Sequence, residues 1–368
     1  MASRFWVAGG TGSWVSADTS NWSATSGGAS GASVPGTADD VFFDANSGAG
    51  TATKAASALT IGSLDMTGST ATIAWASRVM VISAGGTGTI VKLVAAKCSG
   101  AVSFTFSGTV DQTFTSDNYV NVADIIRQGA SGTTQKLIFA SADTTCTGTI
   151  SLLRAKIDFN GKNVRADSFT FSTGAVAREL IMGSGTLTLT NLFTNSTGTV
   201  YTLTINTATL VGDGSLIVTW AGAADTLPPI ICQTSAIGGA FTMNSASPIT
   251  SLQVWKLHAV TCSLQFNQNT TVNDLRFVST EQNNAIEIKS NVTAFTVTGA
   301  VPICFGTVST TTTGVLDGVI AAGTTPWVLR DRSTLGATDT SSLNILTTIN
   351  HGTQNSWQEG RPMLMGVG

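Results

Sequence analysis

The stretch Gly183-Ser-Gly-Thr-Leu-Thr-Leu-Thr190 decides the fold expected of this chain. It begins with turn-forming residues and continues with leucines that alternate with threonines. Successive side chains of a β-strand point to opposite faces of a sheet, so Leu187 and Leu189 face one side and the threonines face the other. Threonine also has a high β-propensity at exposed strand positions. The stretch therefore predicts a turn followed by a short strand with one buried face.

The same pattern returns along much of the chain. Residues 148–153 read GTISLL and residues 214–219 read GSLIVT, each a glycine followed by a short strand-like run. From residue 55 to about residue 310, strand signals recur every ~8–12 residues, a spacing typical of β-sandwiches, of barrels and of the sides of a β-solenoid coil. The similarity between the segments favours an all-β, right-handed parallel β-helix (β-solenoid) with capped ends. Two β-sandwich or barrel domains are the alternative.

The composition supports an all-β protein with a substantial core. The 368 residues include 39 glycines, 42% are hydrophobic and only 11% are charged. Solvent-exposed helices normally carry many more charged residues than this. The hydrophobic content is sufficient for a core, so the chain is expected to fold despite its many glycines and serines.

The charge distribution excludes several classes of partner. The net charge is −3, and the 18 lysines and arginines are scattered without a basic run that could neutralise a phosphate backbone, so we expect no nucleic-acid partner. No apolar stretch approaches the ~20 residues that span a bilayer, so we expect no membrane insertion. Residues 1–6, MASRFW, lead into glycine and serine without the apolar segment of a signal peptide, which predicts synthesis in a cytoplasm.

The cysteines predict neither a disulfide framework nor a metal site. They are odd in number and widely spaced, and no pair has the Cys-x-x-Cys spacing. We interpret them as small buried hydrophobes and expect no cofactor. They are Cys98, Cys146, Cys232, Cys262 and Cys304.

Five segments differ in pattern. Residues 1–50 are rich in tryptophan, glycine and aspartate and predict an N-terminal cap in which Trp6, Trp14 and Trp22, at steps of eight residues, share one face of an extended chain and cover the end of the stack. The remaining segments are a solenoid body at 51–220, a loop or junction at 221–250, a second solenoid part at 251–315 and a C-terminal cap or docking segment at 316–368.

Two features of the sequence resemble parts of catalytic or ligand-binding sites, but their context does not support such a site. Residues 7–12, VAGGTG, resemble a dinucleotide-binding loop, but no apolar helical stripe follows them, so nucleotide binding is not expected. The two histidines, His258 and His351, are far apart in the sequence, which leaves almost no material for a triad or a two-histidine metal site.

Pairs of carboxylates are the remaining candidates for catalytic groups, because polysaccharide-cleaving β-solenoids use acidic side chains on one face. Adjacent Asp39 and Asp40 point to opposite faces of a strand, and Asp213 lies in a Gly-Asp-Gly turn. Glu281 and Glu287 would share a face only if a strand ran through Asn283-Asn284, which is typical of a turn. We therefore expect no catalytic residue. The other acidic candidates considered are Asp44, Asp158 and Asp331.

The N-terminal motifs resemble a known kind of protein. The series Trp6, Gly9-Gly-Thr-Gly-Ser-Trp14, Asn21-Trp-Ser23, Pro35 and Asp39-Asp-Val-Phe-Phe43 resembles the opening cap of bacterial β-helical adhesins and of virion proteins of tailed bacteriophages. The segment Ile157-Asp-Phe-Asn-Gly-Lys-Asn-Val164 is similar to the coils of the same proteins. The resemblance covers about the first 220 residues, and its motifs are structural, so it implies no catalytic residue.

The resemblance implies a function as a virion structural protein. Secreted adhesins carry a signal peptide and an anchoring end, and neither is seen here, which favours the phage proteins. The expectation is a homotrimeric tail fibre or spike for host attachment, or a capsid decoration, assembled with other virion proteins in the host cytoplasm. Trp255 and Trp327 are candidate contacts for a host glycan or a partner. A polysaccharide-degrading tailspike enzyme and a bacterial surface adhesin are the alternatives.

Overall fold

The computed structural model gives a nearly all-β protein, with 3% helix. Parallel strands stack as a β-solenoid of about 9 turns rather than as a barrel, which confirms the predicted fold class and excludes the sandwich and barrel alternative. The structure describes residues 2–14, 17–54, 58–83, 89–129, 134–140, 143–172, 176–195, 201–221, 226–233, 239–256, 262–268, 270–279, 286–290, 295–297, 303–305, 308–309 and 328–330.

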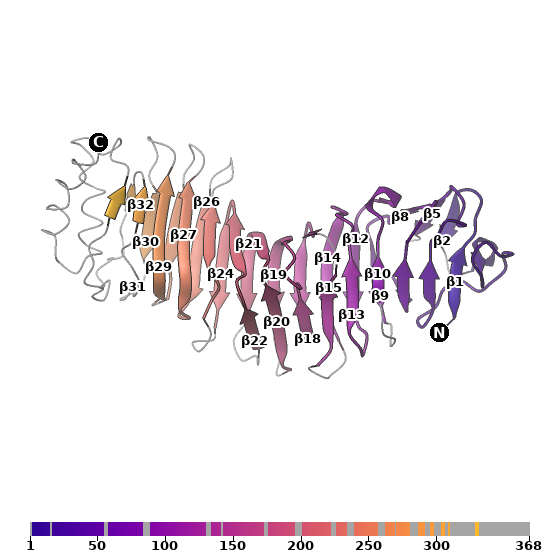
Figure 1. Ribbon diagram of the computed structural model, residues 1–368, viewed down its shortest axis with the longest axis horizontal. Helices are drawn as coiled ribbons and strands as arrows, with labels where there is room; N and C mark the ends of the chain where they lie inside the picture. Colours follow the sequence, from indigo (N-terminus) through magenta and orange to yellow (C-terminus); the bar gives the residue numbers. More distant parts are fainter. Residues whose placement is uncertain are drawn as a thin grey trace, which may run out of the picture. The chain divides into compact units, whose positions relative to one another are not determined.

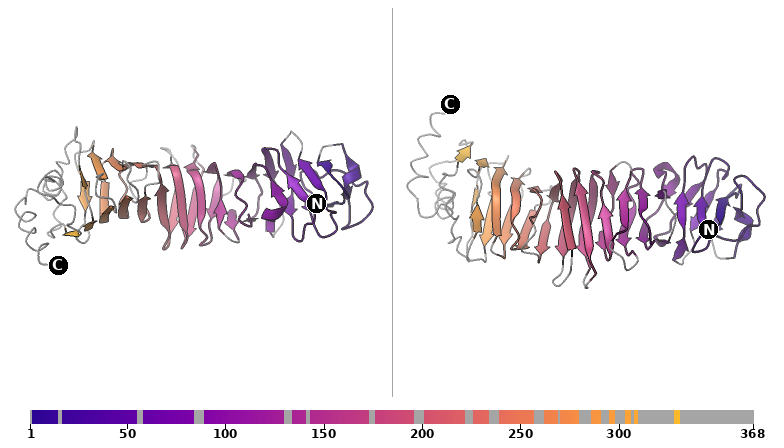
Figure 2. Two further views of the ribbon diagram at one scale, coloured as in Figure 1. Left: turned by 90° about the horizontal axis from the view of Figure 1, so that it is seen from above. Right: turned by 60° about the horizontal axis from the view of Figure 1, so that its bottom comes forward.

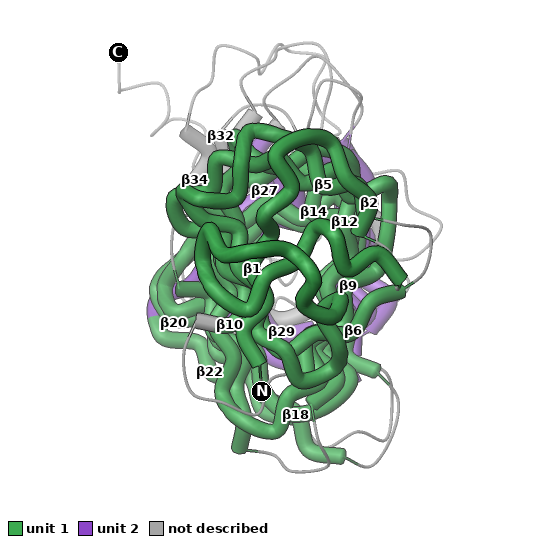
Figure 3. The backbone as a smooth tube through the Cα atoms, turned by 90° about the vertical axis from the view of Figure 1, so that its right-hand side faces the viewer, with its two compact units in different colours: residues 1–187, 198–206 green, residues 188–197, 207–368 purple. Residues whose placement is uncertain are grey.

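The chain divides into two compact units. Unit 1 comprises residues 1–187 and 198–206, and unit 2 comprises residues 188–197 and 207–368 (Figure 3). Residues 221–250, the predicted loop or junction, therefore lie within unit 2.

Unit 1 is built around a 10-stranded sheet to which each coil contributes one strand. Strands β13, β15, β18 and β20 lie side by side in it (Figure 1). In sheet order the strands are β22 (Tyr201–Ile205), β20 (Arg178–Gly183), β18 (Ala155–Asp158), β15 (Lys136–Phe139), β13 (Gln112–Thr115), β10 (Thr89–Lys92), β7 (Ser63–Asp65), β4 (Asp40–Phe42), β1 (Ser3–Trp6) and β3 (Trp22–Ser23).

Two further sets of strands complete the coils of unit 1. A 4-stranded sheet comprises β11 (Cys98–Ser99), β8 (Thr72–Ala74), β5 (Thr51–Lys54) and β2 (Gly12–Trp14). The third set comprises β6 (Leu59–Ile61), β9 (Arg78–Ile82), β12 (Val102–Phe106), β14 (Val122–Arg127), β16 (Thr144–Thr145), β17 (Thr149–Leu152), β19 (Val164–Phe171) and the start of β21 (Thr186–Asn195). The two described 3-10 helices are η1 (Thr19–Asn21) and η2 (Ala95–Lys97).

The residues that alternate along each strand face the core and the solvent in turn. In β18 and β20, Ile157 pairs in parallel with Leu180 and both side chains are fully buried, whereas their strand neighbours are partly exposed. Phenylalanine rings from strand to strand pack edge to face inside unit 1, with ring centroids 5.2 to 6.1 Å apart. These rings belong to Phe114, Phe139, Phe159 and Phe169. The core is thus continuous from coil to coil.

Glycines permit the turns to stack closely. Asn160 and Gly161 both have a positive φ, 50° and 70°, as a tight two-residue turn requires. On the next coil Gly183 has φ 72°, and a Cβ there would lie 2.6 Å from the Gly161 nitrogen. The turn in the opening stretch is therefore glycine because a side chain would collide with the coil beneath.

Unit 2 has the same design as unit 1: its strands lie side by side (Figure 2), and alternate strands pair in parallel. From Thr188 onward β21 belongs to this unit, and Phe193 pairs with Val218. The other strands are β23 (Thr209–Asp213), β24 (Leu216–Trp220), β25 (Ile230–Gln233), β26 (Gly239–Ser245), β27 (Ile249–Lys256), β28 (Cys262–Phe266), β29 (Thr270–Ser279), β30 (Ile286–Ser290), β31 (Phe295–Val297), β32 (Ile303–Phe305), β33 (Val308–Ser309) and β34 (Val328–Arg330).

The structure corrects one prediction in unit 2. Residues 221–250 were predicted to form a loop or junction, but they contain β25, β26 and the start of β27. Strand β25 pairs in parallel with β23 and with β27, and β26 pairs in parallel with β24. The coils therefore continue through this stretch. Most of the predicted C-terminal segment, 316–368, lies outside the described residues.

Candidate functional site

The N-terminal end of unit 1 contains a buried aromatic cluster. Trp6, Trp14 and Trp22 come from β1, β2 and β3, and they pack with Phe43, which follows β4. Trp22 lies 5.2 Å from both Trp6 and Trp14, measured between ring centroids, and 6.1 Å from Phe43. None of the four side chains is more than 2% exposed. The tryptophans thus meet from three separate strands and not, as predicted, along one face of an extended chain.

Packing holds this cluster together. The indole N–H groups of Trp6, Trp14 and Trp22 are buried without a hydrogen-bond partner in the part of the chain that the structure describes. Trp6 and Phe43 stack with their ring planes 19° apart, and the other ring pairs are edge to face or tilted. Such aromatic pairs contribute about 0.5–1.5 kcal/mol each beyond burial of surface.

The strands at this end are covered along their edges. Strand β3 pairs antiparallel with β1 and ends the 10-stranded sheet, and the Trp22 carbonyl accepts hydrogen bonds from the Gly31 and Ala32 N–H groups at 2.9 and 3.0 Å. At β2, the Asn21 amide donates to the Ser13 carbonyl at 3.3 Å. Covering an edge in this way prevents another chain from adding a strand.

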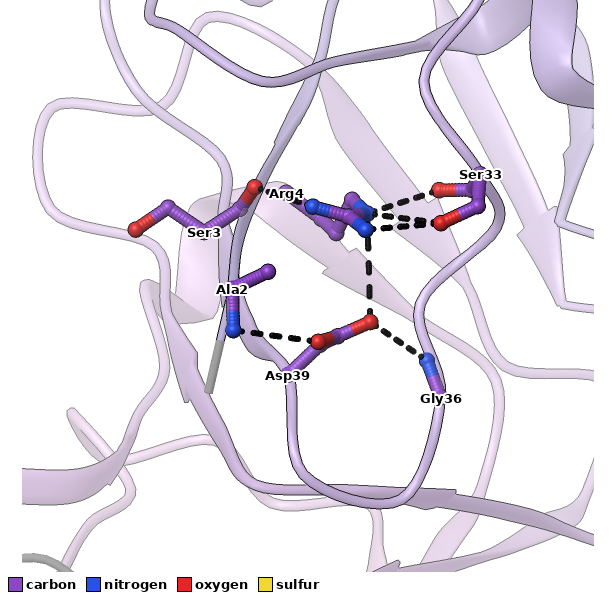
Figure 4. Close-up of polar contacts among 6 residues, drawn as sticks. All are labelled: Ala2, Ser3, Arg4, Ser33, Gly36 and Asp39. Carbon is purple, nitrogen blue, oxygen red and sulfur yellow. Dashed lines mark hydrogen bonds and ion pairs between the residues drawn. The ribbon is translucent and has the colours of Figure 1, made fainter.

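An ion pair fixes the segment that covers the end (Figure 4). The Arg4 guanidinium donates to the Ser33 carbonyl at 2.9 Å and to the Ser33 hydroxyl at 2.7 Å, and its Nε lies 3.8 Å from Asp39 Oδ2. The Asp39 carboxylate also accepts the N–H groups of Ala2 at 3.2 Å and Gly36 at 3.0 Å. One carboxylate thus ties the first strand to the 31–39 segment.

The other acidic candidates also have structural partners. Asp40 accepts the Ser63 hydroxyl at 2.7 Å, across two adjacent strands. Asp44 and Asp158 each accept the N–H group two residues later, at 2.9 Å, which is the bond of an Asx turn. Glu281 and Asp331 lie outside the described residues, and of Glu287 only the backbone, in β30, is described.

Charged side chains on the outer face of the 10-stranded sheet pair between coils. Lys136 and Lys156 are register partners, an arrangement that repels, and each has an acidic neighbour: Asp158 lies 3.1 Å from Lys136 and Glu179 lies 2.6 Å from Lys156. Burial opposes the ionisation of Glu179, but hydrogen bonds from Lys156 and Thr204 outweigh it and lower the pKa of the carboxyl.

In unit 2, three partly exposed side chains lie at matching positions of three neighbouring strands and form a column across the sheet. Asp213, at the end of β23, pairs with Gln233 of β25, which pairs with Trp255 of β27. All three are at outward positions of their strands. The Trp255 indole N–H donates to the Gln253 side chain at 3.1 Å, which fixes the ring on the sheet surface. Trp327, the other candidate contact, lies outside the described residues.

The thiols are not poised for chemistry. Burial raises the pKa of Cys98 to about 11 and that of Cys146 to about 12, and it raises the pKa of fully buried Cys232 well above its usual value. The reactive thiolate form is therefore scarce near neutral pH. Cys146, Cys232 and Cys262 are buried, as their interpretation as small buried hydrophobes predicts, whereas Cys98 is partly exposed.

Clusters of metal-ligating side chains and membrane-spanning helices are both absent from the described residues. No group of three or more His, Cys, Asp or Glu side chains there could hold a metal ion. No helix within the same residues is long and apolar enough to cross a membrane. Of the remaining motifs, residues 7–12 lead into strand β2 and not into a helix, whereas His258 and His351 lie outside the described part.

Comparisons with known proteins give no relative: no protein-family model, curated protein or solved structure matches this chain.

Proposed function

We propose that this chain is a structural protein of a tailed-phage virion, a rigid surface component that serves as a tail fibre or spike for host attachment or as a capsid decoration. The β-solenoid fold is compatible with a rigid fibre or spike. The proposal includes assembly as a homotrimer with other virion proteins in the host cytoplasm.

The observation that carries the proposal is the covered N-terminal end of unit 1. A stack of parallel strands presents open N–H and C=O groups at its end and invites further strands. Here β3, the 31–39 segment and the tryptophan cluster cover that end, in the manner of the terminal repeats that make solenoids discrete. A covered end of this kind suits a particle component whose coils stack within one chain, because it prevents further chains from adding end to end.

Rigidity follows from the coil contacts. Hydrogen bonds and ion pairs join side chains of neighbouring coils, for example Thr204 with Glu179, 25 residues apart, and Asn267 with Asn244, 23 residues apart. Because these contacts join neighbouring coils within each unit, bending either unit would break many contacts together.

We also propose that the protein acts without catalysis. Four of the candidate carboxylates hold turns and strands, namely Asp39, Asp40, Asp44 and Asp158. In a fibre, the Asp213, Gln233 and Trp255 column would supply an aromatic ring beside amide and carboxylate groups, a combination suited to a host glycan.

Particle fractionation tests the virion assignment. Phage particles purified on a density gradient are expected to contain the chain as an abundant protein that remains bound after washing in high salt, and mass spectrometry of the particle band measures it. Recovery of the chain only from the supernatant of the lysate would contradict a structural role in the virion.

Reducing-sugar release tests the absence of catalysis. The purified protein is expected to release no reducing ends from host polysaccharide above the buffer control. Activity that is present in the wild type and lost in Asp213→Ala, Glu281→Ala or Glu287→Ala would instead establish the tailspike enzyme. Asp40→Ala serves as the control, because it removes a carboxylate that bonds the Ser63 hydroxyl within unit 1 and lies outside the column that contains Asp213.

A further inference from the structure

The turn that follows β18 contains the one Asn-Gly pair of the sequence, Asn160-Gly161. Asn160 is exposed, and its side-chain amide forms no hydrogen bond within the described part of the chain. An asparagine can lose its amide group when the backbone nitrogen of the following residue attacks the side-chain carbonyl carbon. Glycine hinders that attack least, because it has no Cβ. The chain thus carries the reacting atoms of a deamidation site at an exposed turn.

The folded turn holds these atoms apart. The Lys162 N–H donates to the Phe159 carbonyl at 2.8 Å, and Asn160 and Gly161 have φ values of 50° and 70°. These are the features of a type I′ turn, in which ψ of the first central residue is about +30°. At that angle the Asn160 Cβ and the Gly161 nitrogen lie on nearly opposite sides of the Cα–C bond. A five-membered ring needs them on the same side, so ψ must rotate by roughly 150° before the attack is possible.

The neighbouring coil opposes this rotation. The Phe159 N–H donates to the Ile181 carbonyl at 2.9 Å, and Ile181 is also the register partner of Asp158. A Cβ built on Gly183 would lie 2.6 Å from the Gly161 nitrogen and 3.0 Å from the Gly161 Cα, so the backbones of the two turns lie against each other. The attacking nitrogen is therefore held in place by the next coil.

We propose that Asn160 is a deamidation site that reacts only when the 159–162 turn separates from Gly183. In the open turn the Gly161 nitrogen bonds to Asn160 Cγ, and the bond from Cγ to the amide nitrogen breaks. The amide group leaves as ammonia with the proton that the Gly161 nitrogen gave up, and a succinimide ring remains. Water then opens the ring at either carbonyl and gives aspartate or isoaspartate.

The two products affect the stack differently. Aspartate keeps the backbone unaltered and adds a negative charge near Asp158, whose carboxylate accepts the N–H of residue 160 at 2.9 Å. Isoaspartate routes the main chain through the former side chain and lengthens the turn by a methylene carbon. Because Gly161 and Gly183 already lie too close for an added Cβ, the lengthened turn cannot stack as before. Isoaspartate at this position therefore prevents the coil from closing.

Peptide mapping by mass spectrometry tests the site. Wild-type protein is incubated at mildly alkaline pH with and without guanidinium chloride, and conversion at Asn160 is followed over time. We expect conversion in the denatured chain and at least about tenfold slower conversion in the folded protein, because only the opened turn reacts. Asn163, which precedes the branched Val164, is the internal control and is expected to react slowly in both. Equal rates at Asn160 in the two conditions, or no reaction in the denatured chain, would overturn the proposal.

Two glycine variants separate the coil contact from a general loss of stability. Gly183 and Gly68 have φ values of 72° and 73°, but only at Gly183 would an added Cβ meet the Gly161 backbone. In the folded state, Gly183→Ala is expected to deamidate at Asn160 at least about tenfold faster than wild type, and Gly68→Ala at the wild-type rate. A folded Gly183→Ala variant that reacts at the wild-type rate would overturn the proposal. The comparison of folded and denatured wild type does not depend on either variant folding.

The stability of the deamidated protein tests the effect of isoaspartate. Deamidated chains from the denatured incubation are refolded and collected by ion exchange. They are expected to unfold at a lower urea concentration than Asn160→Asp, which carries the same added charge on an unaltered backbone. Equal midpoints would show that isoaspartate does not hold the coil open and would overturn that part of the proposal.

Discussion

Replacing Trp22 with alanine is expected to destabilise unit 1 by about 3–5 kcal/mol, the usual cost of removing a fully buried large aromatic side chain. Trp22 contacts Trp6, Trp14 and Phe43 and contributes the strand that ends the 10-stranded sheet. Its loss should therefore also uncover the edge of β1 and cause self-association. Urea denaturation followed by circular dichroism measures the first effect, and light scattering after size-exclusion chromatography measures the second.

Trp255→Ala is the matched control for this variant. It removes the same side chain from a partly exposed position on the face of β27, so a smaller loss of stability and no self-association are expected. If the two variants were equally stable and both stayed monodisperse, the tryptophan cluster would not be what covers the end.

Gly183→Ala is expected to cost about 1–2 kcal/mol for the left-handed backbone and about 1–3 kcal/mol more for overpacking. The residue has φ 72°, and an added Cβ would lie 2.6 Å from the nitrogen and 3.0 Å from the Cα of Gly161. Because these are backbone atoms of the neighbouring coil, the collision cannot be relieved by rotating a side chain.

Gly68→Ala separates the two causes. Gly68 has nearly the same φ, 73°, but the nearest atom to its added Cβ, the Ala45 nitrogen, is 3.9 Å away. It should therefore show only the backbone cost of about 1–2 kcal/mol. Urea denaturation of both variants measures the difference, and equal losses would show that the coils do not stack as closely as described.

The fold was predictable because its determinants are local. Alternation in a stretch such as 183–190 sets the inner and outer faces of one strand, and a glycine fixes each tight turn. Repetition of this unit predicts a stack without any long-range information. The structural roles of Asp44 and Asp158 are local as well, because each carboxylate accepts the N–H group two residues later in an Asx turn.

The error at 221–250 has a specific cause. Residues 221–250 include Pro228-Pro229 and Pro248. Proline argues against a strand because it lacks the N–H group that donates to a neighbouring strand. In the structure the prolines use their carbonyls instead: Leu210 donates to the Pro229 carbonyl at 2.8 Å, and Leu227 donates to the Pro248 carbonyl at 2.7 Å. The coil continues because these positions need an acceptor and not a donor.

The candidate surface of unit 2 was predictable only in part. Trp255 and Asp213 could each be named from the sequence, but 42 positions separate their numbers and nothing local relates them. Their shared column depends on the length of each coil and on the register of β23, β25 and β27. Similarly, eight-residue steps suggested one extended strand for the tryptophans, whereas turns and η1 bring three strands together.

Labelling of purified phage particles tests the central claim most directly. An antibody raised against the purified chain and coupled to gold is applied to particles that are then viewed in negative stain. The account predicts label at one defined location, on the head surface or along the tail, at repeated positions on most particles. Particles that remain unlabelled, while the antibody still recognises the purified chain, would contradict the assignment to the virion.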